Sequence, residues 1–346
     1  MNKFFHELTR SADGEVFFIA EACDNHMGSL EYAKSLAKAA KWAGADAVKF
    51  QHHLPAEEML RECEMTDNFD DHLFDFLEAN SLSLEDHIKL KAFCDEIQIL
   101  YLCTPFSWLA AQEIAELVPF FKIGSGEFAD YWFIDQLVSL QKPVLFSSGM
   151  CIEEEIDANV KHYKEIGLEF AILNCLSEYP PENRDLNLGY VQKLCEKFPN
   201  IVIGHSDHTP DIWSSIIAIS AGAKIIEKHL TLSRFVAGPD ASVSISPAQL
   251  GSLIQAGRQI NCAIGIEKAI RGREIGVRKW AYRSLVLRRA KKVGERIEAK
   301  DICSKRPGTG IPAKDYESVI GMYLLADHEK DSILTYDTLS QDVPSL

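Results

Sequence analysis

The sequence has no excess of basic residues and no long apolar run, and each absence argues against a class of protein. Its 36 lysines and arginines are outnumbered by 51 aspartates and glutamates, which gives a net charge of −15. This charge argues against a broad nucleic-acid surface and against binding to an anionic membrane. No apolar run approaches the roughly 18 residues of a membrane-spanning helix, and the N-terminus is polar and mixed, unlike a signal peptide. We therefore expect no nucleic-acid or membrane partner and a cytoplasmic location.

Cysteine pairs at metal-binding or redox spacing are also missing. The chain has nine cysteines, and none of them forms a C-x-x-C pair. This argues against a zinc cluster and against a thiol redox motif. The odd number, the wide scatter and the size of the chain favour reduced and mostly buried thiols.

What the chain does contain is a series of eight short apolar stretches, each ending in polar residues. They are Phe17–Cys23, Ala47–Gln51, Ile99–Thr104, Phe121–Glu127, Val144–Gly149, Phe170–Ser177, Ile201–His208 and Lys224–His229. The segments between them have the pattern of amphipathic helices. Eight strands that alternate with eight helices predict a (β/α)8 TIM barrel, in which functional residues lie at the carboxyl ends of the strands.

The domain organisation follows from length and composition. A barrel of about 250 residues leaves part of this 346-residue chain over. We predict a catalytic barrel over residues 1–265, a linker rich in arginine, glycine and lysine over 266–283, and a small β-rich module over 284–346. In that module, short strands are expected at Ser284–Leu287 and Arg296–Ile297, with a short helix near Asp315–Val319.

The strand ends would bring scattered polar residues together at one end of the barrel. They are Glu21, Lys49, Gln51, Thr104, Lys122, Ser125, Glu127, Ser147, Ser206, His208, Glu227 and His229. Because His208 and His229 end adjacent strands, their imidazoles suit a divalent transition metal. The alternative is two unrelated histidines, one of them hydrogen-bonded to Asp207.

The two inward-pointing lysines, Lys49 and Lys122, need an anionic partner because an unpaired buried ammonium group is costly. A phosphate or a carboxylate of a substrate is the partner we favour. An internal salt bridge with Glu21 or Glu127 and a Schiff-base lysine remain alternatives.

Other acidic residues and histidines give weaker signals. Glu21, Glu127 and Asp240 could act as general acid, general base or acceptors for sugar hydroxyls. We expect His26 to line the site and His205 to point away from it. His52, His53 and His72 lie in the long excursion over residues 52–82 and are expected to be solvated loop histidines.

Several motifs occur along the chain in a fixed order. They are Ile19-Ala20-Glu21 with Asn25-His26-x-Gly28, Gly44-Ala45-Asp46-Ala47-Val48-Lys49-Phe50-Gln51, Thr104-Pro105-Phe106, Lys122-Ile123-Gly124-Ser125-Gly126-Glu127, Ser147-Ser148-Gly149-Met150, Tyr179-Pro180, Ser206-Asp207-His208-Thr209, Glu227-Lys228-His229, Gly238-Pro239-Asp240 and Lys305-Arg306-Pro307-Gly308-Thr309-Gly310. Together they resemble the sialic acid synthase family, whose members make nonulosonic acids. The last motif looks like the signature of that family's antifreeze-like SAF domain.

The resemblance implies a reaction and a set of residue roles. Phosphoenolpyruvate would condense with the open-chain aldehyde of an N-acylmannosamine-type sugar, giving a nonulosonic acid and phosphate. By similarity, His208 and His229 would hold Mn²⁺ or Mg²⁺ as a Lewis acid. The residues matching phosphoenolpyruvate contacts are Lys49, Thr104, Lys122, Ser125, Ser147 and Ser206, and those matching sugar contacts are Gln51, Glu127, Tyr179 and Asp240. Glu21, Glu127, His208 and His229 would be catalytic.

The same resemblance implies a domain-swapped homodimer, in which Arg306 of one subunit reaches the sugar bound by the other. The chain departs from the family pattern at Ser177, where some members carry asparagine, and at Ser148, where threonine is usual. These departures leave the sugar open. A modified or 6-phosphorylated sugar of the legionaminic or pseudaminic type, with Arg271–Arg273 as a weak candidate cation, remains an alternative. A lysine-dependent aldolase and a sugar-binding module without catalysis are alternatives of other classes.

Overall fold

A computed structural model describes residues 3–11, 15–62, 72–235 and 238–344. The chain divides into two compact units, Met1–Gly265 and Ile266–Leu346. The segment predicted as a linker contains the helix α12 (Gly272–Ala281). Within the described residues, no helix is both long and apolar enough to cross a membrane.

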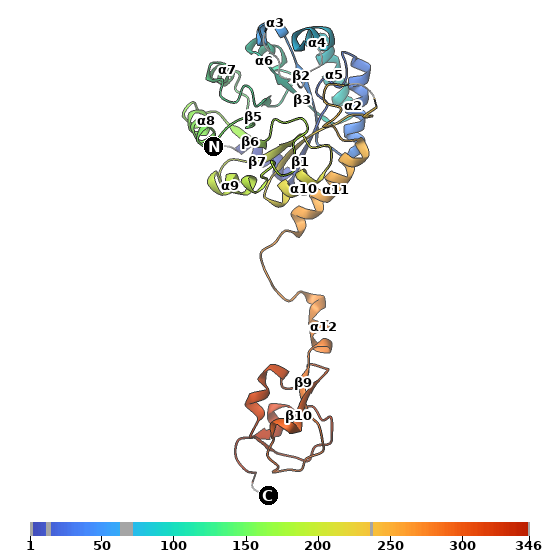
Figure 1. Ribbon diagram of the computed structural model, residues 1–346, viewed down its shortest axis with the longest axis vertical. Coiled ribbons are helices and arrows are strands. Elements are labelled where there is room, and N and C mark those ends of the chain that lie inside the picture. The colour runs from blue at the N-terminus through green and yellow to red at the C-terminus, as the bar shows by residue number, and fades with distance from the viewer. Residues whose placement is uncertain (1–2, 12–14, 63–71, 236–237, 345–346) are drawn as a thin grey trace. The chain divides into compact units, whose positions relative to one another are not determined.

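The first unit is built on eight parallel strands (Figure 1). They are β1 (Phe17–Glu21), β2 (Ala47–His52), β3 (Leu100–Pro105), β4 (Phe121–Ile123), β5 (Val144–Ser147), β6 (Phe170–Cys175), β7 (Ile203–Asp207) and β8 (Ile225–His229). The order in the sheet is β3-β2-β1-β8-β7-β6-β5-β4, and its two end strands, β3 and β4, also lie in contact. The strands therefore form a nearly closed barrel, which confirms the predicted TIM-like fold.

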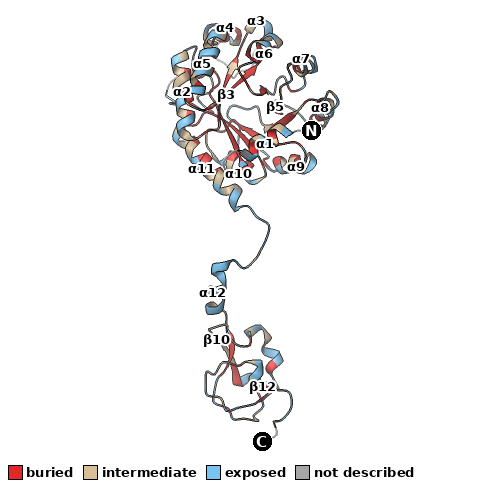
Figure 2. Ribbon diagram, turned by 180° about the vertical axis from the view of Figure 1, so that it is seen from behind, coloured by how far each residue is buried: buried red, intermediate tan, exposed pale blue. Residues whose placement is uncertain are grey.

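Helices cover the outside of this barrel. The helices after successive strands are α2 (Leu30–Ala43), α5 (Leu84–Glu96), α6 (Trp108–Ile114), α7 (Tyr131–Leu137), α8 (Glu153–Glu165), α9 (Gly189–Lys197), α10 (Trp213–Ser220) and α11 (Pro247–Ala263), and the long β2–α5 connection adds α3 (Pro55–Glu58) and α4 (Leu73–Asn80). Gly44 ends α2 with a left-handed φ of 89°, as expected for a helix C-cap. Buried residues gather in the strands and exposed residues along the outer helix faces (Figure 2).

The lower interior of the barrel is apolar. Ile19, Ala47, Leu102, Leu145 and Leu173 form part of one buried cluster inside it. The N-terminal arm contributes to this cluster, which the sequence did not predict: helix α1 (Lys3–Ser11) buries Phe5 completely, against the segments where the strands begin. With its lower end filled by side chains, the barrel has space for a ligand only at the carboxyl ends of its strands.

The second unit is a small β-rich domain with its own core. Strand β9 (Ser284–Leu287) pairs with β10 (Ile302–Lys305), and β11 (Tyr323–Leu324) pairs with β12 (Leu339–Ser340), all antiparallel. Arg296 forms only an isolated bridge to Tyr323, and the helix expected near Asp315–Val319 is the 3₁₀ segment η4 (Ala313–Val319). The core includes Leu285, Leu287, Ile297, Leu324 and Leu334.

Gly204, on the inner face of β7, is required by close packing. A Cβ atom at this position would lie 2.3 Å from the carbonyl oxygen of Ile225 and 2.4 Å from Leu173 Cδ2. An alanine therefore forces β7 and β8 apart or displaces Leu173. Since Ser206 and His208 lie two and four residues further along, this distortion would reach the upper end of the barrel.

We expect Gly204→Ala to lower the free energy of unfolding by about 1–3 kcal/mol, because the added methyl group overpacks the barrel interior. Gly189→Ala is the matched control, since a Cβ atom there meets nothing within 4 Å. Its change should stay within about 0.5 kcal/mol. Urea denaturation of both variants measures the difference, and equal stabilities would contradict the packing argument.

Candidate active site

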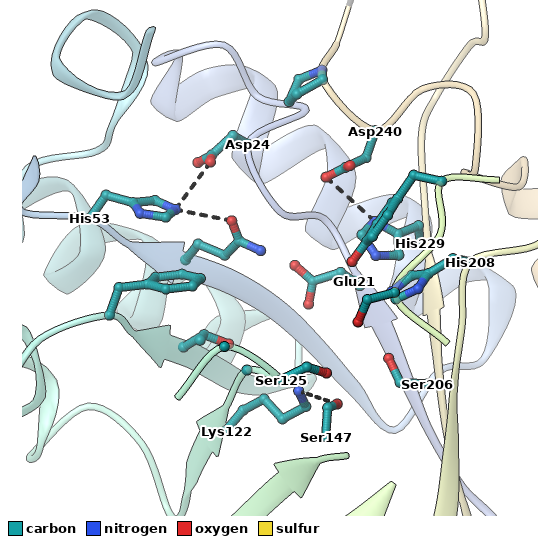
Figure 3. Close-up of a pocket in the computed structure, with 18 of the residues that line it drawn as sticks. Glu21, Asp24, His53, Lys122, Ser125, Ser147, Ser206, His208, His229 and Asp240 are labelled. Atoms are coloured by element: carbon teal, nitrogen blue, oxygen red, sulfur yellow. Dashed lines mark hydrogen bonds and ion pairs between the residues drawn. The ribbon is translucent and has the colours of Figure 1, made fainter. Parts of the chain in front are cut away.

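A cavity of about 580 Å³ opens at the carboxyl ends of the barrel strands (Figure 3). All barrel residues that were assigned a catalytic, metal or substrate-binding role line it. These residues are Glu21, Lys49, Gln51, Thr104, Lys122, Ser125, Glu127, Ser147, Tyr179, Ser206, His208, His229 and Asp240. Residues far apart in sequence thus converge on one space, as the strand pattern predicts.

Strand register explains this convergence. Glu21 is the register partner of Lys49 on one side and of His229 on the other, and Ser206 is the partner of Glu227. Because side chains alternate between the two faces of a strand, residues two apart point the same way. Glu227 and His229 therefore both face the cavity, while Lys228 between them faces outward.

Lys49 is fully enclosed by carboxylates and a hydroxyl. Its ammonium group contacts the Glu21 carboxylate, lies 3.7 Å from Glu227, and donates a hydrogen bond of 3.0 Å to Thr104 Oγ1. Burial opposes the charge on Lys49, but the two carboxylates hold its pKa above its usual value. Burial raises the pKa of Glu21 to about 7, although Lys49 opposes this shift. The salt bridge between Lys49 and Glu21 is therefore present, as one of the alternatives predicted.

Lys122 forms the second cationic position. Its Nζ atom lies 3.6 Å from a Glu227 oxygen and donates a 2.8 Å hydrogen bond to Ser147 Oγ, while Ser206 Oγ donates to Glu227 at 2.9 Å. Burial lowers the pKa of Lys122 in spite of Glu227. The ammonium groups of Lys49 and Lys122 thus face the carboxylates of Glu21 and Glu227. Glu21 has a pKa of about 7, so its carboxylate is readily neutralised by a proton. The cluster can therefore accept an anion together with a proton.

The turns of small residues after β4 and β5, next to these lysines, pack closely against each other. The backbone N–H of Gly149 donates a 3.0 Å hydrogen bond to Ser125 Oγ. A Cβ atom at Gly149 would lie 2.2 Å from Ser177 Oγ and 2.7 Å from Ser125 Oγ. Glycine is therefore needed for the turns after β4 and β5 to meet at the cavity wall.

His208 and His229 lie side by side, with ring centroids 5.2 Å apart (Figure 3). Nδ1 of His208 lies 2.8 Å from the carbonyl oxygen of Leu176, to which it donates, so Nε2 is the nitrogen left for a ligand. Burial opposes the charge on His208, but hydrogen bonds to Cys175 and Leu176 raise its pKa above the usual value. Burial, together with His208 and Lys49, holds the pKa of His229 well below its usual value, so this imidazole is neutral. Tyr179 stacks on His208 at a centroid distance of 4.0 Å.

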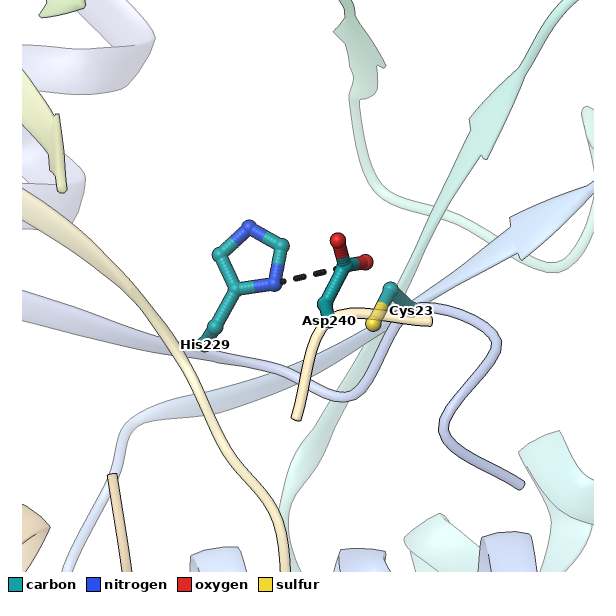
Figure 4. Close-up of side chains that lie close together, drawn as sticks. All are labelled: Cys23, His229 and Asp240. Carbon is teal, nitrogen blue, oxygen red and sulfur yellow. Dashed lines mark ion pairs between the residues drawn. The ribbon is translucent and has the colours of Figure 1, made fainter. Parts of the chain in front are cut away.

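Asp240 and Cys23 lie together beside the imidazole of His229 (Figure 4). The potential ligand atoms of Cys23, His229 and Asp240 all lie within 4.8 Å of one another, and His229 Nδ1 is 3.7 Å from the Asp240 carboxylate. Burial raises the pKa of the Cys23 thiol well above its usual value. His229 Nδ1 is buried and has no hydrogen-bond partner among the described residues. The two imidazoles and the Asp240 carboxylate are ligand types that fit a divalent cation.

A buried ion pair lies behind the two imidazoles, on the outer face of the same strands. Lys228 Nζ lies 2.9 Å from Asp207, with both side chains at most 1% exposed. Asp207 also accepts hydrogen bonds from the Thr209 backbone and hydroxyl and from the hydroxyls of Ser214 and Ser215. Since Asp207 precedes His208 and Lys228 precedes His229, this pair fixes how the two histidine-bearing strands end.

His53 differs from its expected role as a solvated loop histidine. It is buried, stacks on Phe106 at 4.3 Å, and lies 2.9 Å from Glu58, 3.1 Å from Gln51 Oε1 and 3.3 Å from Asp24. Burial alone lowers the pKa of His53, but hydrogen bonds to Asp24 and Glu58 raise it to about 9. His53 is therefore a cation that lines the cavity.

Other predicted histidines lie outside the cavity. His52 is also buried, where it contacts Glu113 at 2.7 Å, so the expectation of a solvated residue is wrong there too. His26 was expected to line the site, but it is buried beside Asp24 and is not part of the cavity wall. His205 points away from the cavity, as predicted, with Nδ1 2.9 Å from the carbonyl oxygen of Asn174.

Glu227 was expected among the converging strand-end residues but was assigned no role; it lies within ion-pair distance of both lysines, and its position two residues before His229 is the signal that it faces inward. Other cavity residues were left out of the predicted site. Asp24, His53 and Glu58 gave no comparable signal, because they come from loops whose course the strand pattern does not define. Arg306 belongs to the second unit, where its guanidinium lies 4.7 Å from the Trp280 ring centroid.

The fold and the site define a (β/α)8-barrel enzyme with buried lysines and paired imidazoles at the carboxyl ends of its strands. The sequence pattern of the NeuB family matches residues 36–269, and that of the SAF domain matches residues 282–340. The chain belongs to the NeuB family and is one of its enzymes.

Named relatives cover nearly the whole chain. It is 33% identical to the N,N'-diacetyllegionaminic acid synthase of Legionella pneumophila, over 91% of this chain and 92% of the relative. It is 28% identical to the human N-acetylneuraminate-9-phosphate synthase, over 92% and 91% of the two chains. The crystal structure of the N-acetylneuraminic acid synthetase from Leptospira borgpetersenii, in complex with citrate, has a TM-score of 0.69 and 30% identity, covering 76% of this chain and 91% of that one.

We expect Lys228→Met to lower the free energy of unfolding by about 3–5 kcal/mol, because it leaves the Asp207 carboxylate buried without its cation. Lys161→Met is the control, since Lys161 is 78% exposed and its ion pair with Glu165 is 3.8 Å long. Its effect should be below about 1 kcal/mol. Chemical denaturation at pH 7 checks both values, and a loss as small as that of the control would show that the pair does not fix the strand ends.

The stability contribution of His53 should depend on pH. Because its folded-state pKa is raised from 6.5 to about 9, the contribution is complete below about pH 6.5 and is lost as the pH rises through 9. The difference in unfolding free energy between the wild type and His53→Gln should therefore narrow from pH 6.5 to pH 9.5. Urea titrations across this range measure it, and a difference that stays constant or widens would contradict the assignment of His53 as a cation.

Proposed function

We propose that this enzyme is a nonulosonate synthase that condenses phosphoenolpyruvate with the open-chain aldehyde of an N-acylmannosamine-type sugar. The observation that carries the proposal is the convergence in one cavity of two buried lysines with two buried imidazoles and Asp240. The first group suits a small polyanion, and the second suits a divalent cation. The named relatives, which include synthases of neuraminic and legionaminic acids, support the same reading.

The phosphoenolpyruvate end of the cavity is assigned to the lysines. Lys49 and Lys122 neutralise the phosphate and carboxylate, and the hydroxyls of Thr104, Ser125, Ser147 and Ser206 donate hydrogen bonds to their oxygens. Uptake of a proton by Glu21, whose pKa is about 7, would release Lys49 to pair with the incoming anion.

His208, His229 and Asp240 would hold the divalent metal, Mn²⁺ or Mg²⁺. When bound, such an ion supplies Lewis-acid polarisation of the aldehyde oxygen. The protein's own residues orient the partners, so that C3 of the enolpyruvate forms the new bond to the aldehyde carbon. The protonated Glu21 would give its proton to the former aldehyde oxygen and then accept a proton from the water that adds to C2. The C2–O bond to phosphate breaks, and the departing phosphate takes the remaining hydroxyl proton. One phosphoenolpyruvate, one aldehyde and one water thus give one 2-keto acid and one phosphate.

The sugar is assigned to the wider part of the cavity. Gln51, Glu127 and Asp240 present acceptors for hydroxyl and amide groups, and Tyr179 offers a ring face beside His208. Burial raises the pKa of Glu127, which makes this residue suitable as a proton donor. We extend the proposal to a domain-swapped homodimer, in which Arg306 from the partner's SAF domain completes the sugar site.

The proposal is tested by phosphate release from phosphoenolpyruvate in the presence of amino sugars. His229→Ala and Lys122→Met should each reduce turnover by at least about 1,000-fold, as expected when a group acting in the transition state is removed. His162→Ala, at a surface position outside the cavity, is the control. Removal of divalent ions with a chelator should abolish turnover, and Mn²⁺ should restore it.

A lysine-dependent aldolase makes the opposite predictions. A chelator would leave its activity intact, and borohydride with a 2-keto acid would trap an adduct on Lys49 or Lys122. Either result, with folding verified by circular dichroism, would overturn the proposed synthase.

A further inference from the structure

The cavity has an apolar part that the lysines and histidines do not explain. Met59, the α4 residues Leu73, Phe76 and Leu77, and Phe106 line it; we call these five residues the apolar lobe. Phe106 stacks on His53. Figure 3 places His53 and Asp24 across the cavity from His208 and His229. The apolar lobe therefore belongs to the side remote from the groups assigned to the aldehyde.

The charged groups next to the apolar lobe are mostly acidic. Asp24, Glu58 and Glu127 line the cavity here, and the cation among them, His53, is held by Asp24 at 3.3 Å and by Glu58 at 2.9 Å. A phosphate group on this side would face carboxylates without a free cation from the barrel, and the proposed domain swap leaves Arg306 of the partner subunit as the remaining cation at the sugar.

No other basic residue of the barrel supplies that cation. Among the described residues that line the cavity there is no arginine, and both lysines contact Glu227. Arg61, close to α4 in sequence, is 56% exposed and pairs with Asp75 and Glu78. The stretches outside the described residues, 1–2, 12–14, 63–71, 236–237 and 345–346, contain neither lysine nor arginine.

An acylamino group matches this surface better than a phosphate or a hydroxymethyl group. Its methyl group would bury against the apolar lobe, which is favourable because apolar surface leaves water. Its N–H can donate to a carboxylate, and Glu58 and Glu127 each have one buried oxygen without a partner among the described residues. A phosphate has no N–H to donate and adds negative charge.

We propose that the acceptor sugar is unphosphorylated and carries an apolar acylamino or methyl substituent at the end remote from its aldehyde. This inference rests on the proposed function and specifies its substrate class. The apolar lobe and the acidic residues beside it are then the elements that determine specificity.

Three acceptors test the proposal with the full-length enzyme, phosphoenolpyruvate and Mn²⁺. They are N-acetylmannosamine, its 6-phosphate, and 2,4-diacetamido-2,4,6-trideoxymannose. The kcat/KM of the diacetamido sugar should exceed that of N-acetylmannosamine by about 10-fold or more, as expected for methyl groups entering an apolar pocket. The 6-phosphate should be at least about 100-fold poorer than the diacetamido sugar, because like charges meet.

The outcomes separate this inference from the proposed function. Phosphate release from none of the sugars would overturn the proposed function itself. Release with the 6-phosphate as the best acceptor, or equal kcat/KM for the diacetamido sugar and N-acetylmannosamine, would leave the synthase in place and overturn the inference about its acceptor.

Variants of the lobe provide a second, independent readout. Leu73→Asn should reduce the ratio of kcat/KM for the diacetamido sugar to that for N-acetylmannosamine by about 10-fold, because it places an amide against the acyl methyl group. Leu60→Asn is the matched control, since Leu60 is 82% exposed and does not line the cavity; it should leave the ratio unchanged. Met59→Arg should raise the relative kcat/KM of the 6-phosphate by supplying the missing cation. Unchanged ratios in both lobe variants would contradict the proposal.

Discussion

The site depends on the burial of two lysine ammonium groups at the upper end of a barrel. Each ammonium group removed from water loses several kcal/mol of solvation, which only closely placed opposite charges can offset. Glu227 contacts both Lys49 and Lys122, and Glu21 contacts Lys49. Four strands, β1, β2, β4 and β8, must therefore keep their relative positions for these charges to meet. A cavity built in this way is already arranged to receive an anion.

Strands β7 and β8 place cavity-lining side chains on one face and anchoring side chains on the other, because side chains alternate along a strand. Inward positions of β7 and β8 carry Ser206, Glu227 and His229, which face the cavity. Outward positions carry Asp207 and Lys228, whose ion pair lies beneath the surrounding helices. The cavity-lining residues and the residues that anchor the strands thus occupy opposite faces of β7 and β8. The Asp207–Lys228 ion pair on the outer face fixes the strand ends that carry the two imidazoles.

Most of what the sequence predicted came from two features: the apolar runs that mark the strands, and the rule that functional residues lie at the carboxyl ends of barrel strands. The eight strands and their helices were recognisable because each strand is an apolar run followed by polar residues. The inward-facing groups at strand ends followed from the same pattern. His53, Asp24 and Glu58 did not, because loops have no period from which burial can be inferred. Helix α1 was missed because the role of Phe5 is set by the opening it fills, a tertiary feature that short sequences do not reveal.

Charge varies across the cavity in a way that gives the substrates a direction. Two ammonium groups, paired with Glu21 and Glu227, lie at one side, and further carboxylates surround His53 at the other. Under the proposed function, an anionic donor is attracted by the lysines and repelled by the carboxylates around His53, which leaves that side to a neutral acceptor. An acceptor with its own phosphate would weaken this separation of donor and acceptor. Under the proposed function, the carboxylates around His53 would thus keep the phosphate ester at the lysines.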